Sequence, residues 1–171
     1  PWKHTGSDTG VDEQMWRKAR RQNNLAYYQM YVAKQKNGRF REQALQIIDR
    51  LHESLKIPLL QRIQAGKFQM GRLKPDLGGR EESRDEQPVV SVHISGFYMG
   101  KYEVTQEQYR ATMGANPSQW HTCANCPVET VSWYDAVEYC NRLSIKAGYQ
   151  PCYVIEGYGT QPDDWPANWK D

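Results

Sequence analysis

The chain has 171 residues, of which 39% are hydrophobic and 25% are charged, and its mean hydropathy is −0.87. This composition is typical of a soluble globular protein with one medium domain, or with a small domain and an appendage. No stretch approaches the ~20 consecutive apolar residues of a membrane helix, which excludes a spanning segment at the level of sequence. The chain starts with Pro1 and shows no secretory signal, so we expect a processed chain or a fragment.

Charge divides the chain near residue 75. Residues 1–74 contain fifteen Lys and Arg against six Asp and Glu, whereas residues 75–171 contain seven against fourteen. A change of sign of this size suggests two units with separate surfaces. The basic residues fall within a helical pattern that carries no known nucleic-acid motif. We therefore interpret them as a solvated helix face and expect no nucleic-acid partner.

Three helices are predicted between Val11 and Leu55. Asp12 has the side chain of a helix N-cap and is expected to begin the first helix, and Leu25 to Gln35 form the second. The third has the clearest helical spacing of apolar residues. Its apolar face consists of Phe40, Ala44, Ile47, Ile48, Leu51 and Leu55.

The front segment resembles the tetratricopeptide-like helical hairpins that precede other domains in bacterial multidomain proteins. The residues that carry this resemblance are Trp16, Ala19, Tyr31, Gly38, Arg39, Phe40 and Ala44. One such unit is present, whereas a solenoid needs about three repeats for stability. The segment is either a docking or spacer element or a helical extension that packs on the next domain, and we favour the extension.

Short strands are predicted in the middle of the chain. Lys67 to Gly71, Val89 to Ile94 and Phe97 to Val104 each have strand character, and the second alternates apolar and polar residues as a half-buried strand does. The charged stretch 72–87 between the first two is expected to be an exposed, mobile loop. Its acidic residues would repel phosphate, so it does not read as a phosphate-binding loop.

Two capping boxes predict the starts of two further helices. Thr105 is followed at the third position by Gln108, and Ser132 by Asp135. Gly148 is the expected C-cap of the second helix. The N-cap role explains both hydroxyl residues, so we assign Thr105 and Ser132 structural rather than catalytic roles. The apolar stripe predicted for the second helix is Trp133, Ala136, Val137, Cys140 and Leu143.

Four cysteines are candidate disulfide or thiol positions: Cys123, Cys126, Cys140 and Cys152. A zinc site would need more paired ligands than the one Cys-x-x-Cys provides, and a redox-active pair would favour a helix N-terminus. Disulfides, between Cys140 and Cys152 and locally or between chains at Cys123 and Cys126, and inert thiols remain open. Disulfides would imply an oxidising compartment, and we favour an extracytoplasmic location, periplasmic or surface.

An ordered series of motifs runs through the second part of the chain. It consists of Phe68, Met70, Gly71, Pro88, Val92, Phe97, Tyr98, Met99, Tyr102, Glu103, Val104, Thr105, Tyr109, Pro127, Val128, Glu129, Val131, Ser132, Trp133, Asp135, Ala136, Tyr139 and Cys140. From Lys67 to Asp171 the chain thus resembles the sulfatase-modifying-factor family, whose namesakes are formylglycine-generating enzymes. The resemblance implies an irregular α+β fold related to C-type lectins, incomplete here and preceded by an all-α extension. We accordingly expect a helical extension at 1–64 and a sulfatase-modifying-factor-type domain at 65–171.

The resemblance also implies that such a domain continues with a Gly-Tyr-Arg-Leu-Pro-Thr-Glu block, which this sequence lacks. In formylglycine-generating enzymes the copper-binding cysteine pair and the calcium sites belong to that later half. We therefore transfer no catalytic, cofactor-binding or metal-binding residue to this chain, and expect copper and calcium only in the missing half.

The sequence thus predicts a non-catalytic binding or accessory module that presents a C-type-lectin-like scaffold to protein or glycan partners. A completing or assembly partner is one form of this prediction. The alternative is an oxidoreductase of the formylglycine-generating type, which oxidises a cysteine in a target peptide and whose catalytic half lies outside this chain.

Overall fold

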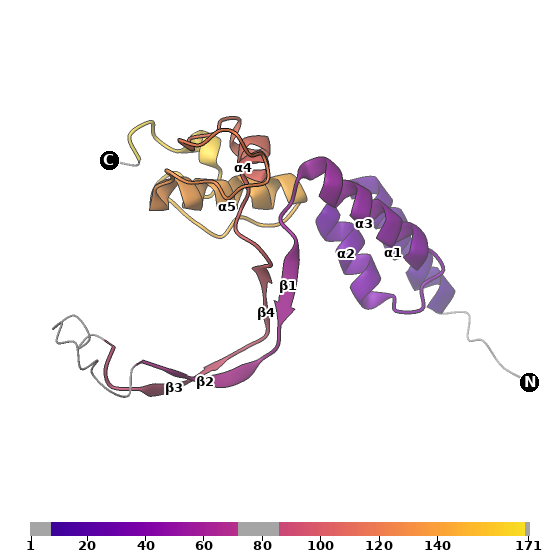
Figure 1. Cartoon of the computed structure of the whole chain (residues 1–171). Coiled ribbons are helices and arrows are strands. Elements are labelled where there is room, and N and C mark those ends of the chain that lie inside the picture. Colours follow the sequence, from indigo (N-terminus) through magenta and orange to yellow (C-terminus); the bar gives the residue numbers. More distant parts are fainter. Residues whose placement is uncertain (1–7, 72–85, 170–171) are drawn as a thin grey trace, which may run out of the picture. The chain divides into compact units, whose positions relative to one another are not determined.

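The computed structural model describes residues 8–71 and 86–169, and its chain divides into two compact units, residues 1–58 with 103–171 and residues 59–102 (Figure 1). It has helices and short antiparallel strands, an α+β composition. The elements are α1 (Asp8–Gln22), α2 (Leu25–Lys34), α3 (Arg41–Leu55), β1 (Leu60–Ile63), β2 (Gly66–Met70), β3 (Val90–Ile94), β4 (Phe97–Gly100), α4 (Gln106–Met113), α5 (Trp133–Ala147) and the short 3-10 helix η2 (Pro162–Asp164). The loop predicted at 72–87 lies outside the described residues, apart from its last two positions.

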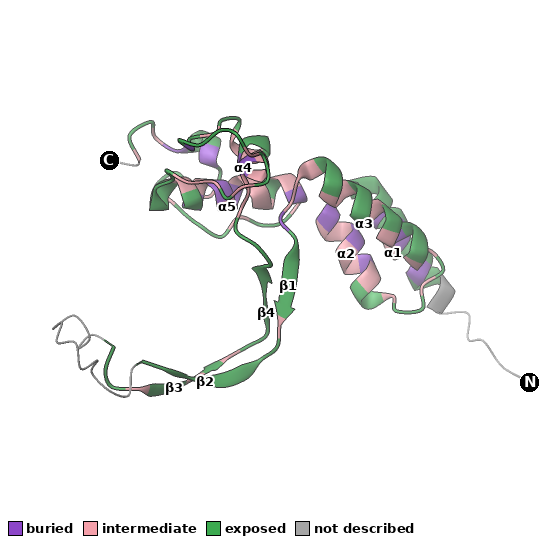
Figure 2. Ribbon diagram, viewed as in Figure 1, coloured by how far each residue is buried: buried purple, intermediate pink, exposed green. Residues whose placement is uncertain are grey.

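Helices α1, α2 and α3 pack side by side around an aromatic core (Figures 1 and 2). The Trp16 ring stacks on Phe40 with a centroid distance of 5.1 Å and makes tilted contacts with Tyr28 and Tyr31. The small residues Ala19 and Ala44 are buried beside these rings and allow the helices to approach closely. The core of this segment therefore depends on aromatic packing, which contributes beyond the area that it buries.

Asp12 does not cap α1, which corrects the sequence prediction. The helix begins at Asp8, so Asp12 lies within it, and its carboxylate accepts hydrogen bonds from the Tyr31 hydroxyl at 2.6 Å and the Arg39 amide at 3.0 Å. The Phe40 amide in turn donates to the Tyr31 hydroxyl at 3.2 Å. Burial, together with the hydrogen bond to Asp12, raises the pKa of Tyr31 to about 12. This buried polar cluster joins α1, α2 and the turn before α3.

The second unit consists of two antiparallel strand pairs, β1 with β4 and β2 with β3. The sequence prediction missed β1 and extended β4 to Val104, whereas β4 ends at Gly100. In the β2–β3 pair, Phe68 lies opposite Val92 and Met70 opposite Val90, so apolar side chains share one face of this ribbon. That face is largely exposed, as Figure 2 shows.

Helices α4 and α5 both begin at reciprocal side-chain caps. The Thr105 hydroxyl accepts from the Gln108 amide at 3.2 Å, and the Gln108 side chain accepts from the Thr105 amide at 3.0 Å. Ser132 and Asp135 make the equivalent pair at the start of α5, with distances of 2.9 and 3.1 Å. These bonds satisfy amide groups that have no partner within a helix.

The buried face of α5 differs from the predicted apolar stripe. Trp133 is exposed, and Tyr139 and Asn141 are buried in its place. The Tyr139 ring stacks on Tyr109 of α4 with a centroid distance of 5.4 Å and an interplanar angle of 9°. Val137 of the predicted stripe is buried, and Cys140 and Leu143 are half-buried. The buried residues extend to both sides of that stripe because α4 packs on Tyr139 and the segment after α5 packs on Asn141, and a periodicity within α5 cannot locate those neighbours.

Replacing Gly38 with alanine tests the polar cluster around Asp12. An added Cβ would meet the Tyr31 hydroxyl at 2.6 Å and the Asp12 carboxylate at 2.7 Å. We expect Gly38→Ala to lower the free energy of unfolding by about 1–3 kcal/mol, as measured by urea denaturation. Gly10→Ala in α1 is the matched control, because a Cβ there meets nothing within 4 Å. Equal stability of the two variants would contradict the prediction.

Alkaline unfolding tests the burial of Tyr139. Burial raises the pKa of Tyr139 to about 12, from 10.0 for a free tyrosine. The unfolded chain loses this proton first, so the free energy of unfolding falls as the pH rises from 10 toward 12. We expect Tyr139→Phe to make that fall shallower, and to cost little at pH 7 because the hydroxyl has no hydrogen-bond partner of good geometry among the described residues. Tyr98→Phe, at an exposed position, should leave the slope unchanged.

Candidate functional site

The start of α4 holds a disulfide-containing loop by its backbone. The amides of Gln106 and Glu107 each donate at 2.9 Å, to the carbonyls of Cys126 and Ala124 respectively. Cys123 and Cys126 form a disulfide within this loop. The disulfide commits both sulfurs, and the described residues include no group of three or more His, Cys, Asp or Glu that could hold a metal ion. In this structure the loop is a turn that a disulfide closes, and it is bonded to the N-terminus of α4.

A buried carboxamide organises the rest of this loop. The side chain of Gln106 donates to the carbonyls of Trp120 at 2.9 Å and Pro127 at 3.4 Å, and accepts from Asn116 at 2.9 Å. Asn116 in turn accepts from the Ser118 amide at 3.2 Å. These bonds satisfy polar groups of a segment that has no regular secondary structure, and so fix its path.

The loop leaves Trp120 exposed at 75% of its surface. Its backbone is nevertheless held, because the Trp120 amide donates to the Glu129 carboxylate at 3.0 Å and the Glu129 amide donates to the Ser118 hydroxyl at 3.2 Å. Hydrogen bonds from Thr130 and then from the Trp120 amide lower the pKa of Glu129. The indole therefore projects from an ordered backbone.

An aromatic cluster forms where α5 meets the end of the described chain, and consists of Trp133, Tyr134, Trp165 and Trp169. Tyr134 makes edge-on contacts with Trp133 at 5.4 Å and with Trp169 at 5.6 Å between ring centroids, and Trp165 contacts Trp169 at 4.5 Å. Trp165 is buried, whereas Trp133 is 68% and Tyr134 38% exposed. The cluster therefore presents two exposed rings on an anchored base.

Asn141 attaches the segment after α5 to that helix. Its fully buried side chain donates to the carbonyls of Tyr153 at 2.7 Å and Thr160 at 2.8 Å, and accepts from the Tyr153 amide at 3.1 Å. Further along, the Trp165 indole donates to the Gly159 carbonyl at 3.0 Å. Asn141 and the ion pair between Arg142 and Asp163 thus both attach to α5 the segment that leads to Trp165, the base of the aromatic cluster.

Cys140 and Cys152 are free thiols in the structure, which does not form the disulfide that the sequence left open between them. Cys140 is half-buried on α5, and Cys152 is exposed in the following segment. Burial, and then the neighbouring Cys152, raises the pKa of the Cys140 thiol. Of the four predicted cysteine positions, the structure therefore joins Cys123 with Cys126 and keeps the other two reduced.

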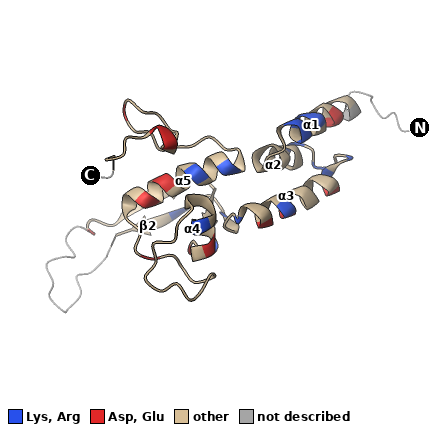
Figure 3. Cartoon of the chain, turned by 90° about the horizontal axis from the view of Figure 1, so that it is seen from above, with Lys and Arg blue, Asp and Glu red and all other residues tan. Residues whose placement is uncertain are grey.

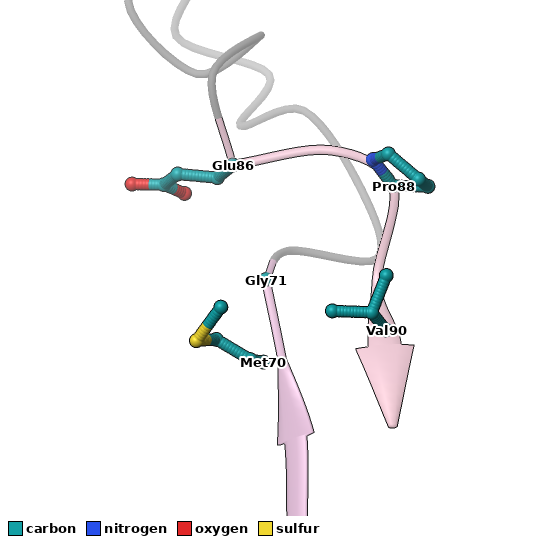
Figure 4. A pocket seen from close by; sticks show the side chains of 5 residues that line it. All are labelled: Met70, Gly71, Glu86, Pro88 and Val90. Atoms are coloured by element: carbon teal, nitrogen blue, oxygen red, sulfur yellow. The ribbon is translucent and has the colours of Figure 1, made fainter. Parts of the chain in front are cut away.

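A small hollow lies at the end of the β2–β3 ribbon in the second unit (Figure 4). Its volume is about 400 Å³, and its lining consists of Met70, Gly71, Glu86, Pro88 and Val90. It adjoins residues 72–85, which lie outside the described residues, and we assign it no function.

The buried polar side chains are the residues that sequence reasoning missed. They are Gln106, Ser118 and Asn141, and the half-buried Asn116 belongs to the same network as Gln106. One signal was available, since asparagine in the middle of a helix is unfavourable unless its side chain has a specific partner. Asn141 is such a residue. Nothing comparable marks Gln106, because glutamine is ordinary in the first turn of a helix.

The middle of the chain matches a known family. Residues 50–159 match the model of the sulfatase-modifying factor enzyme 1-like domain. The chain belongs to this family. It is 46% identical over 87 residues to "Chaperone protein LppX" of Paenibacillus barcinonensis, an alignment that covers 51% of this chain and 31% of that protein. A similar solved structure is Treponema denticola variable protein 1, with a TM-score of 0.52 and 30% identity over 64% of this chain and 39% of that chain.

The chain spans about a third of the length of the curated relative and about two fifths of that solved structure. Across residues 8–71 and 86–169, no helix is both long enough and apolar enough to cross a membrane.

Replacing Asn141 with alanine tests whether this side chain holds the segment after α5. The variant leaves two carbonyls and one amide without their partner, so we expect the free energy of unfolding to fall by about 2–4 kcal/mol. Hydrogen exchange at the Tyr153 amide should also accelerate. Asn168→Ala, at an exposed asparagine of the same segment, is the control and should change stability by less than about 0.5 kcal/mol. If Asn141→Ala leaves the free energy of unfolding unchanged, other contacts hold the segment.

Proposed function

We propose that this chain is a non-catalytic binding and accessory domain, and that the aromatic cluster holds an apolar segment of a protein partner. The observation that carries this proposal is the exposure of Trp133, which presents 68% of its surface while its neighbour Tyr134 is fixed by ring contacts on both sides. Large aromatic side chains that are both exposed and ordered are typical of interaction surfaces.

Burial of such a ring provides the driving force for binding. Covering the exposed part of an aromatic side chain of this size contributes about 2 kcal/mol. Because Tyr134 and Trp169 already restrict the neighbouring rings, little side-chain entropy is lost on association. The cluster is thus preorganised for an apolar partner.

The acidic side chains near the cluster are engaged within the chain and select no charge on the partner. Asp135 and Glu138 lie in the first half of α5, whereas Arg142 and Lys146 lie in the second half (Figure 3). The Asp135 carboxylate accepts from the Ser132 amide at 2.9 Å, and Glu138 pairs with Arg142 at 2.8 Å. The apolar rings therefore carry the proposed recognition.

The kind of partner is suggested by the relative named a chaperone. A chaperone's partner is a polypeptide, and an apolar segment of a polypeptide fits a cluster of exposed rings. A completing or assembly partner of this domain is a special case of the same chemistry. Aromatic rings also stack on sugars, so a glycan is the competing ligand that the experiment has to separate.

Binding of a permanently unfolded protein tests the proposal. Reduced and carboxymethylated α-lactalbumin, labelled with a fluorophore, serves as the apolar polypeptide, and a panel of neutral oligosaccharides serves as the glycan arm. We expect the polypeptide to bind and Trp133→Ala to weaken it about tenfold, which corresponds to about 1.4 kcal/mol. Fluorescence anisotropy at fixed ionic strength measures both.

Trp120→Ala is the matched control, since Trp120 is equally exposed but makes no ring contact within the cluster. An equal loss of affinity in the two variants would show that any exposed indole binds the polypeptide, and would contradict the proposed site. Binding of an oligosaccharide in place of the polypeptide would overturn the protein partner and leave a glycan-binding module.

We further propose the architecture that this function would use. The helical segment 1–64, with its tetratricopeptide-like features, is an extension, and residues 65–171 are the N-terminal part of a C-type-lectin-like domain located outside the cytoplasm. The family match over residues 50–159 and the TM-score of 0.52 support the domain part of this proposal. The disulfide between Cys123 and Cys126 supports an oxidising compartment.

A second candidate function rests on the family match alone. A longer parent protein would be an oxidoreductase of the formylglycine-generating type, with the copper and calcium sites in the part beyond this chain. Its test is mass spectrometry of a cysteine-containing peptide of the sulfatase type after incubation with the full-length protein. Conversion of that cysteine to an aldehyde would favour the enzyme over the accessory domain, and an unchanged peptide would count against it.

A further inference from the structure

We infer that Cys140 and Cys152 are a redox-responsive pair, which closes to an intramolecular disulfide when the protein meets a small-molecule disulfide such as oxidised glutathione. This site is separate from the aromatic cluster and does not depend on the proposed binding function. It is also distinct from the local disulfide between Cys123 and Cys126.

The positions of the two thiols follow from the residues next to them. Asn141 and Tyr153, which directly follow Cys140 and Cys152, are joined by two hydrogen bonds of 2.7 and 3.1 Å between the Asn141 side chain and the Tyr153 backbone. These bonds draw the backbone of the second cysteine toward α5. Disulfide formation needs the two Cα atoms within roughly 4.4–6.8 Å, so the inference requires that the segment held by Asn141 can bring Cys152 to that distance from Cys140.

A third bond of the clamp limits how the segment can move. The Asn141 side chain also donates to the carbonyl of Thr160 at 2.8 Å, so the chain on both sides of the turn at 155–159 is tied to one helical position. The effect of Cys152 on the other thiol agrees with this geometry, because after burial the neighbouring Cys152 is the second cause that raises the pKa of Cys140.

The unequal exposure of the thiols assigns their roles. Cys152 is exposed, so its thiolate attacks one sulfur of oxidised glutathione, forms a mixed disulfide and releases one glutathione. Cys140 is half-buried, and its thiolate attacks the Cys152 sulfur of that mixed disulfide, forms the intramolecular bond and releases the second glutathione. Two cysteines are oxidised and one glutathione disulfide is reduced, and the two thiol protons end on the two glutathiones.

The disulfide between Cys140 and Cys152 would link the segment after α5 covalently to that helix, in addition to the hydrogen bonds of the Asn141 side chain. A cross-link of this kind stabilises the folded state chiefly by restricting the unfolded chain. The oxidised protein should therefore melt at a higher temperature than the reduced form, and should protect the segment 149–160 more strongly from hydrogen exchange.

The experiment titrates the whole chain with mixtures of oxidised and reduced glutathione. We expect both thiols to disappear together, the intact mass to fall by two hydrogen atoms, and non-reducing peptide mapping to show Cys140 linked to Cys152. The Cys123–Cys126 bond should be present throughout. The result should not depend on protein concentration, and should be the same in Trp133→Ala, so it stands apart from the binding proposal.

Two variants keep the inference falsifiable. In Cys140→Ser, the mixed disulfide between Cys152 and glutathione should persist, because the attacking thiol is missing. In Cys152→Ser, an exposed change that leaves the core intact, modification of Cys140 should be at least about tenfold slower, as expected for a thiol with a raised pKa and limited access. A wild-type protein that keeps a stable glutathione adduct on Cys152, or that links through Cys152 to a second chain, would overturn the inference.

Discussion

The buried side chain of Asn141 is the interaction on which the C-terminal part of the molecule depends. It makes three hydrogen bonds to backbone groups of Tyr153 and Thr160, and its fully buried position keeps solvent away from these bonds. Removing it would leave a loop-rich segment without the partners that a helix or a sheet would supply. The indole of Trp165 donates to the Gly159 carbonyl of this same segment.

The same device is repeated at Gln106, where a carboxamide in the first turn of α4 satisfies the backbone of the loop that ends at Pro127. The helices of the front segment are held differently, by stacked rings around Trp16 and by the shared hydrogen bonds of Asp12 and Tyr31. A carboxamide both donates and accepts hydrogen bonds, so it can pair with the free amide and carbonyl groups of an irregular backbone. Helices already pair their own backbone groups, so apolar rings are sufficient to hold them together.

This difference explains how much of the structure could be predicted from the sequence. The helix beginning at Thr105 and the one beginning at Ser132 follow local rules, because a capping box acts within four residues. The role of Asp12 could not be predicted, since its partners Tyr31 and Arg39 are distant in sequence. A short, exposed strand such as β1 has no apolar alternation to reveal it, and is defined by pairing with β4.

The aromatic cluster that includes Trp133 could not be predicted from the sequence, for a related reason. Helical periodicity placed Trp133 on the apolar stripe of α5, but a stripe reports which residues share a face and not which face is covered. The cover here comes from α4, which packs on Tyr139, and from the segment that Asn141 holds, whereas Trp133 in the first turn of α5 stays 68% exposed. Recognising the partner of a helix needs the tertiary arrangement, which a single sequence does not provide.

A fold stabilised in this way separates the residues that hold it from the residues that it displays. Asn141 and Gln106 act through backbone atoms, so the side chains of the loops that they fix remain available at the surface. Trp120 illustrates this separation, because its backbone carbonyl and amide are both bonded while its indole is exposed. Loop side chains of such a scaffold can change without loss of the bonds that fix the loop. Under the proposed function, specificity would lie in exposed side chains such as Trp133, which the framework positions but does not need for its own stability.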